Sequence, residues 1–165
     1  RLVDALPFDA LGEIAAKIQP LGWHIVTYFE AAELPDLLDF FTSLPTTVVV
    51  DHMGRPDVSK SVDGPEFGLF LKLLEEHPNF WSKVSCPERL SQQGPPSYSD
   101  VIPFARKVVE TFPDRVLWGT DWPHPNVRHM PDDGDLIDLL VDLIPDEATR
   151  RRVLVDNPAT LYDFR

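Results

Sequence analysis

Four strand-like runs, each preceded by a helix-like stretch, constrain the fold of this chain more than any other feature of its sequence. The strand-like runs, rich in β-branched and aromatic residues, are 23–29, 46–50, 80–85 and 115–121. The helix-like stretches are 9–19, 33–43, 66–77, 101–111, 136–143 and 147–155. The run 46–50 is apolar without alternation, which is typical of a strand buried on both faces. Such alternation predicts parallel strands joined by right-handed crossovers, and therefore an α/β fold.

The length of the chain decides between the α/β architectures. Its 165 residues, 43% of them hydrophobic, suffice for one sizeable core. A closed (β/α)₈ barrel has eight strands and about 250 residues, whereas this chain offers four strands. No glycine-rich phosphate loop follows any strand, so the sequence does not support a nucleotide-binding open sheet. We therefore expect one folding unit over residues 1–165 that forms half of a TIM-type barrel with a parallel sheet.

Charge and cysteine content exclude several classes of partner. The chain has 27 acidic and 15 basic residues, a net charge of −12, which argues against binding to nucleic acid or to anionic membranes. One cysteine, Cys86, cannot form an internal disulfide, and no apolar stretch reaches the roughly 20 residues that a membrane span needs. We expect a reduced, cytoplasmic protein. Because the chain opens on Arg1 without an initiator methionine, we also expect it to begin within a longer protein.

Polar side chains with catalytic potential follow each of the expected strands. Tyr28 lies at the end of the first, and His52, Arg89 and Asp121 follow the second, third and fourth. Active sites of parallel α/β barrels lie at this edge of the sheet. A histidine can polarise a carbonyl and a carboxylate can activate water, so His52 with Asp121 suggests hydrolysis. Each residue alone also fits a structural role: a hydrogen-bonded histidine, a capping aspartate, a surface ion pair for Arg89 and a core aromatic for Tyr28.

Three motifs carry a resemblance to a known family. They are Val50-Asp51-His52-Met53-Gly54-Arg55-Pro56, Ser85-Cys86-Pro87-Glu88-Arg89-Leu90 and Trp118-Gly119-Thr120-Asp121-Trp122-Pro123-His124-Pro125. Together they resemble the amidohydrolase superfamily, most closely its lactonase branch that acts on 2-pyrone-4,6-dicarboxylate without a metal. The resemblance implies that the four strands are the fifth to eighth of a barrel. It also implies hydrolysis of this cyclic ester to an open-chain carboxy-hydroxymuconate, a step in the breakdown of lignin-derived aromatics.

The same resemblance implies a role for each of five residues. Asp121 would take a proton from the attacking water and pass it to the leaving enol oxygen, while His52 would polarise the lactone carbonyl. Arg89 and Arg1 would hold the carboxylates of the substrate, since a guanidinium pairs bidentately with such groups. Tyr28 would add a hydroxyl hydrogen bond.

Further residues beside these motifs have open roles. Arg55, His124 and Asn126 could either shape the loops or take part in the chemistry. Cys86 has no histidine partner in its sequence context, so we interpret it as a packing residue rather than a nucleophile.

The resemblance does not decide whether a metal is bound, and two alternative functions stay open. We expect no metal; if Zn²⁺ or Mn²⁺ is present, His52 and Asp121 would be ligands together with paired histidines of an upstream half. Those histidines and a further arginine are missing here, so the chain alone should be nearly inactive, and its unpaired strand edges should aggregate or recruit the missing half. The alternatives are a metal-dependent decarboxylase or lactonase of the same superfamily, and a non-catalytic half-barrel fragment.

Overall fold

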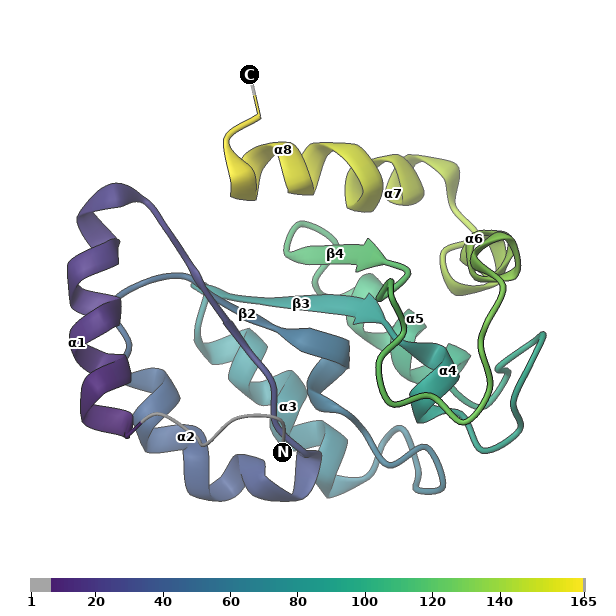
Figure 1. Cartoon of the computed structure of the whole chain (residues 1–165), viewed down its shortest axis with the longest axis horizontal. Helices are drawn as coiled ribbons and strands as arrows, with labels where there is room; N and C mark the ends of the chain where they lie inside the picture. The colour runs from purple at the N-terminus through teal and green to yellow at the C-terminus, as the bar shows by residue number, and fades with distance from the viewer. Residues whose placement is uncertain (1–6, 165) are drawn as a thin grey trace.

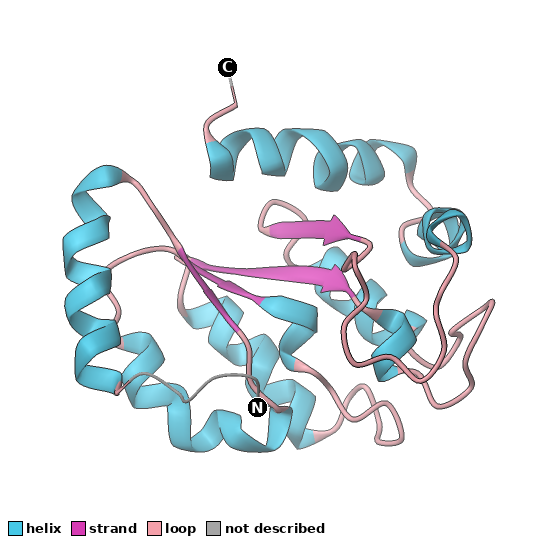
Figure 2. Ribbon diagram, in the orientation of Figure 1, coloured by secondary structure: helices cyan, strands magenta, loops and turns pink. Residues whose placement is uncertain are grey.

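The computed structural model describes residues 7–164 and contains a single sheet of four parallel strands. The strands are β1 (Ile25–Thr27), β2 (Val48–Val50), β3 (Phe80–Ser85) and β4 (Val116–Gly119), and they lie side by side in chain order. Val26 is opposite Val49, and Val84 is opposite Trp118. Parallel neighbours place all four carboxyl ends at one edge of the sheet (Figure 2). The expected α/β class with four parallel strands is confirmed.

Helices join the strands and cover the sheet. They are α1 (Phe8–Ile18), α2 (Leu34–Thr42), α3 (Pro65–Glu76), α4 (Pro87–Leu90), α5 (Ile102–Thr111), α6 (Asp133–Leu143), α7 (Glu147–Arg151) and α8 (Asn157–Tyr162). A turn of π-helix, Arg152–Asp156, links α7 to α8, which run alongside β4, whereas α1 and α2 lie toward β1 and β2 (Figure 1). Short 3₁₀ turns occupy Gln19–Leu21, Ala31–Glu33 and Asp51–Gly54. None of the helices in residues 7–164 has the length and hydropathy of a membrane-spanning segment.

The core lies between the sheet and its helices. Val48, Val49 and Val50 are fully buried, as their non-alternating pattern indicates for a central strand. The helices contribute apolar side chains at helical spacing, among them Phe67, Phe70, Leu73, Leu74, Phe104, Val108, Leu136, Leu139, Leu140 and Leu143. This packing fixes the strand ends and therefore the loops that follow them.

The structure corrects several expected boundaries. Three strands are shorter than the expected 23–29, 46–50 and 115–121, because the paired register covers only Ile25–Thr27, Val48–Val50 and Val116–Gly119. A helical turn, α4, replaces the loop expected after β3, since Pro87 supplies a favourable first helical position. The last helical segment continues to Tyr162 instead of ending at 155. Arg1 lies outside the described residues.

Candidate active site

Three strand ends bring His52, Cys86 and Asp121 together. They follow β2, β3 and β4, and one potential ligand atom from each lies within 4.8 Å of the other two. All three have left-handed backbone conformations, with φ of 53°, 65° and 65°. Such conformations are unfavourable for residues other than glycine and concentrate at functional sites, where the surrounding structure holds them. The backbone itself therefore marks this edge of the sheet as a candidate active site.

His52 is buried and oriented by two contacts. Its Nδ1 lies 2.9 Å from Ser85 Oγ, and its Nε2 lies 3.7 Å from Asp121 Oδ1. Burial lowers the pKa of His52, and the nearby carboxylates of Asp121 and Asp51 offset this only in part. The imidazole is therefore neutral near pH 7. When Ser85 donates to Nδ1, Nε2 carries the proton and can donate it to a carbonyl oxygen.

Arg89 connects Asp121 to Tyr28. Its Nη1 lies 3.4 Å from Asp121 Oδ2, and its Nη2 donates to the Tyr28 hydroxyl at 3.0 Å. The Tyr28 hydroxyl in turn donates to Glu30 Oε1 at 3.2 Å. The guanidinium is thus held between a carboxylate that can accept a proton and a hydroxyl that accepts from Arg89 and donates to Glu30.

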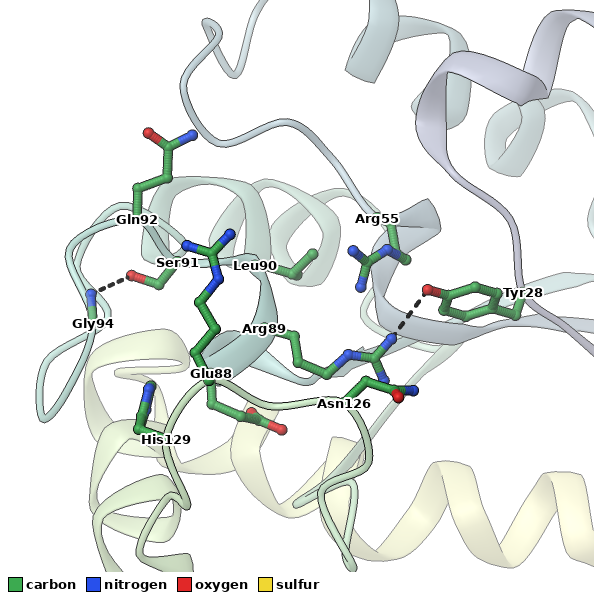
Figure 3. A pocket seen from close by; sticks show the side chains of 11 residues that line it. Tyr28, Arg55, Glu88, Arg89, Leu90, Ser91, Gln92, Gly94, Asn126 and His129 are labelled. Atoms are coloured by element: carbon green, nitrogen blue, oxygen red, sulfur yellow. Dashed lines mark hydrogen bonds between the residues drawn. The ribbon is translucent and has the colours of Figure 1, made fainter. Parts of the chain in front are cut away.

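A pocket of about 600 Å³ opens beside this network (Figure 3). Its lining residues come from the loops after all four strands: Tyr28, Arg55, Glu88, Arg89, Leu90, Ser91, Gln92, Gly94, Asn126, Arg128 and His129. The guanidinium carbons of Arg55 and Arg89 lie 5.5 and 5.7 Å from the centre of the Tyr28 ring. Three arginines and one buried acid line the pocket, so its lining carries an excess of positive charge in a chain of net charge −12. Two of these arginines also face acids beside the pocket, Arg55 facing Glu30 and Arg89 facing Asp121. Such a pocket favours an anionic ligand.

The three loop residues with open roles lie in different surroundings. Arg55 and Asn126 line the pocket, and Arg55 also pairs with Glu30 at 2.9 Å. His124 is buried outside the lining, with Nδ1 3.5 Å from Glu88 Oε1 and Nε2 3.3 Å from Asp133 Oδ1. Its position indicates loop support rather than contact with a ligand.

The structure brings His52, Asp121, Arg89 and Tyr28 together at one edge of the sheet, and their catalytic and binding roles stay predictions. Sequence reasoning did not single out Ser85, Glu88, Arg128 and His129, which contact His52 or line the neighbouring pocket. Ser85 and Glu88 lie inside a motif that sequence reasoning had selected, so their proximity could have been inferred. Arg128 and His129 lie in the long connection before α6, and no periodicity or motif marks that connection.

Cys86 is buried, as expected for a packing residue, but it also belongs to the site. Its thiol faces Asp121 and lies close to Glu88 and Arg89. Burial is the main cause that raises the pKa of Cys86 far above its ordinary value, and the charges of Glu88 and Asp121 add to it. A thiol that stays protonated is a poor nucleophile at neutral pH.

The donors of His52, Cys86 and Asp121 fit a transition metal in type and spacing. Imidazole nitrogen, thiol sulfur and carboxylate oxygen are all ligands that Zn²⁺ accepts. The Arg89 guanidinium lies at the other oxygen of the same carboxylate and already supplies a positive charge there. The site can therefore accept a cation, and it contains a cationic group of its own.

Comparisons with known proteins match most of the chain. A family model described as Amidohydrolase matches residues 3–164. A 2-pyrone-4,6-dicarboxylate hydrolase of Comamonas testosteroni is 64% identical over 98% of this chain and 56% of its own length. A 4-sulfomuconolactone hydrolase of Hydrogenophaga intermedia is 42% identical over 86% of this chain and 47% of its own length.

Solved structures share the fold. The crystal structure of a probable 2-pyrone-4,6-dicarboxylic acid hydrolase from Acinetobacter baumannii, with citric acid bound, matches with a TM-score of 0.77. Its sequence is 27% identical, and the match covers 92% of this chain and 57% of that chain. The chain spans about half the length of the relatives it matches.

Proposed function

The chain belongs to the amidohydrolase family, and we propose that the protein containing it hydrolyses the ring ester of 2-pyrone-4,6-dicarboxylate. The observation that carries this proposal is an arginine-rich pocket whose Arg89 contacts the Asp121 carboxylate, which in turn lies 3.7 Å from the neutral His52. A planar dianion with an ester carbonyl is complementary to this site: its carboxylates match the arginines, and its carbonyl matches the histidine and the carboxylate. The 64% identity to a hydrolase of that name supports this choice of substrate.

The residues support a simple sequence of bond changes. Asp121 accepts a proton from water as the water oxygen attacks the lactone carbonyl carbon. His52 donates a hydrogen bond to the carbonyl oxygen, where negative charge develops. The ring C–O bond then breaks, and the departing enol oxygen takes the proton back from Asp121. The product is an open-chain carboxy-hydroxymuconate, which a pathway for lignin-derived aromatics would consume.

Substrate binding is assigned to the arginines and Tyr28. Arg89 pairs with one carboxylate of the substrate. The Tyr28 hydroxyl, which accepts from Arg89 and donates to Glu30 in the structure, turns its proton from Glu30 to the substrate when the substrate binds. Asn126 and Arg55 line the same pocket and can donate to the substrate as well. Arg1, which lies outside the described residues, remains assigned to the second carboxylate.

We propose that the reaction needs no metal. The Arg89 guanidinium 3.4 Å from Asp121 supports this, because a fixed cation at the carboxylate supplies part of the positive charge that a metal would bring. A Zn²⁺ or Mn²⁺ ion, when bound, would be held by His52 and Asp121 and would polarise the carbonyl as a Lewis acid. A metal-dependent lactonase or decarboxylase is therefore the second candidate, and the His52, Cys86 and Asp121 donor set favours it.

We further propose that the sheet is the second half of a (β/α)₈ barrel in a cytoplasmic protein. The share of the relatives that the chain covers and the catalytic side chains at the carboxyl ends of parallel strands support the half-barrel. The paired histidines and the further arginine implied by the family resemblance would then come from the other half. A fragment without that half would be the non-catalytic alternative.

The test is turnover by the complete reading frame that contains this chain. Loss of pyrone absorbance is followed with 2-pyrone-4,6-dicarboxylate, with and without a chelator. We expect chelator-resistant turnover, its loss in Asp121→Asn with substrate still bound, and a KM raised roughly tenfold or more in Arg89→Met. Turnover that requires added Zn²⁺ or Mn²⁺ would favour the second candidate. Normal turnover by Asp121→Asn would contradict the mechanism.

A further inference from the structure

The loop that carries the proposed base has a strained backbone. Asp121, His124 and Asn126 have φ of 65°, 56° and 60°, although none of them is glycine. The His124 N–H donates to the Asp121 carbonyl at 2.8 Å and closes a tight turn between them. Left-handed conformations of this kind persist only where other contacts stabilise them. The loop therefore needs an anchor.

His124 is the one buried residue of the segment 121–126. Its ring lies between two acidic side chains from different elements. Glu88 of α4 faces Nδ1 at 3.5 Å, and Asp133 in the first turn of α6 faces Nε2 at 3.3 Å. The ring thus connects the segment after β4 to the helices on both sides of it.

The buried carboxyl group of Glu88 lacks a hydrogen-bond partner among the described residues. Its side chain is fully buried, and within residues 7–164 neither its carboxyl oxygens nor the ring nitrogens of His124 complete a hydrogen bond, so the two groups face each other at ion-pair distance. A buried polar group without a partner is unfavourable, so its contact with His124 matters to both residues. Glu88 also directly precedes Arg89, which contacts Asp121 and Tyr28.

We propose that His124, held between Glu88 and Asp133, is a positioning residue that sets the orientation of Asp121 and Asn126. The Glu88–His124 contact joins the segments after β3 and β4, so it also fixes Arg89 relative to Asp121. His124 does not line the pocket, whereas Asn126 does. It therefore acts through its neighbours in the chain. This inference rests on the proposed function, because it assigns Asp121 the role of base.

The first test distinguishes a positioning role of His124 from a role in folding alone. His124→Phe keeps an aromatic ring of similar size and removes both nitrogens. In the complete protein we expect kcat to fall about 100-fold while KM changes less than about fivefold, because a small displacement of a catalytic group affects the chemical step most. The matched control is His77→Phe, at the end of α3 and remote from the pocket, which should retain normal turnover.

The second test examines the contact itself. Glu88→Gln keeps a hydrogen-bonding side chain of the same length and should retain kcat to within about fivefold, whereas Glu88→Leu should lose about as much as His124→Phe. The double variant His124→Phe/Glu88→Leu should be no worse than either single variant, because both remove one shared contact. Fully additive losses would contradict the proposal.

A third measurement does not depend on turnover. Amide hydrogen exchange should accelerate in segment 121–126 of His124→Phe while β2 and β3 keep wild-type protection. If the wild-type protein does not hydrolyse the lactone, the proposed function fails, and this exchange measurement still decides the positioning role. Unchanged exchange in 121–126, or faster exchange throughout the chain, would overturn the inference.

Discussion

The environment of His52 keeps its imidazole neutral, and this has a consequence for stability. Burial lowers the pKa of His52 below 6.5, so the unfolded chain binds a proton at a higher pH than the folded chain does. The contribution of a neutral His52 to folding is therefore complete above pH 6.5. It decreases as the pH falls from 6.5 toward the folded-state pKa.

The direction of this pH dependence of stability can be measured by comparison with a variant that lacks the imidazole of His52. We expect the stability advantage of the wild-type protein over His52→Gln, measured by urea unfolding, to shrink between pH 8 and pH 5.5. Wild-type turnover should fall over the same acidic range, because a protonated His52 also changes the charge beside Asp121. Parallel stability curves for the two proteins would show that the pKa of His52 is not lowered.

Arg128 gives a prediction about substrate binding. It lines the pocket with Arg55 and Arg89, and it forms no ion pair within residues 7–164, so its charge is available to a ligand. Because its side chain is exposed, we expect Arg128→Met to raise KM for the dicarboxylate only about three- to tenfold, with kcat nearly unchanged. Arg106→Met is the control, because Arg106 donates to a carbonyl near the end of α6 instead. Equal changes in KM for the two substitutions would show that Arg128 does not contact the substrate.

Individual residues differ in how far the sequence could identify them. His52, Arg89 and Asp121 follow strands directly, and adjacency of parallel strands brings such positions together in any fold of this class. Glu88 and His124 both lie within motifs that the sequence singled out. Their contact with each other could not be predicted, because it joins segments 36 residues apart in the chain. Arg128 depends on the course of a long irregular segment, which no local pattern specifies.

At the scale of elements, α8 depends on one buried amide. Asn157 donates from Nδ2 to the carbonyls of Pro113 at 2.8 Å and Val116 at 2.7 Å, and it is 4% exposed. These bonds tie α8 to the start of β4, the strand whose other end leads to Asp121. Removal of the amide leaves the buried carbonyl of Val116 and the partly buried carbonyl of Pro113 without this donor.

We therefore expect Asn157→Leu to lower the free energy of unfolding by about 1–3 kcal/mol. The control in the same helix is Thr160→Ala, since among the described residues the exposed Thr160 hydroxyl bonds only to the Asp156 carbonyl one turn earlier. Thr160→Ala should lower the free energy of unfolding by less than about 0.5 kcal/mol. Urea unfolding of both variants in the complete protein provides the measurement. Similar small losses in both would show that the amide does not stabilise the attachment of α8.

Local sequence patterns predicted the elements best where packing and propensity agree. The run 80–85 became β3 with the expected bounds, because Phe80–Ser82 pair with β2 and Ser82–Ser85 pair with β4, so every residue of the run is paired. Residues 23–29 formed only a three-residue strand, since Trp23 and Tyr28 lie beyond the paired register and are largely exposed. The expected helix ended at residue 155, before α8. In the structure Pro158 occupies the first turn of α8, where proline is tolerated.

For the whole molecule, the sheet has two edges among the described residues, and apolar side chains are exposed near one of them. Trp23 and Val26 are 63% and 46% exposed around β1, and β4 likewise pairs on one side only. Unpaired strand edges favour association with other chains. In the proposed barrel, the other half would pair with both edges. The chain covers only about half of its relatives, which is consistent with that arrangement.

The proposed half-barrel makes a direct prediction about the 165-residue chain. Expressed alone, it should elute from size-exclusion chromatography as oligomers or aggregates, bind a hydrophobic dye strongly, and show no lactone turnover. Co-expression with the preceding part of its reading frame should yield a defined complex with low dye binding and restored turnover, because the edges of β1 and β4 become paired. A monomeric, dye-negative chain that gains nothing from the preceding segment would contradict the half-barrel and favour an open sheet that is complete with four strands.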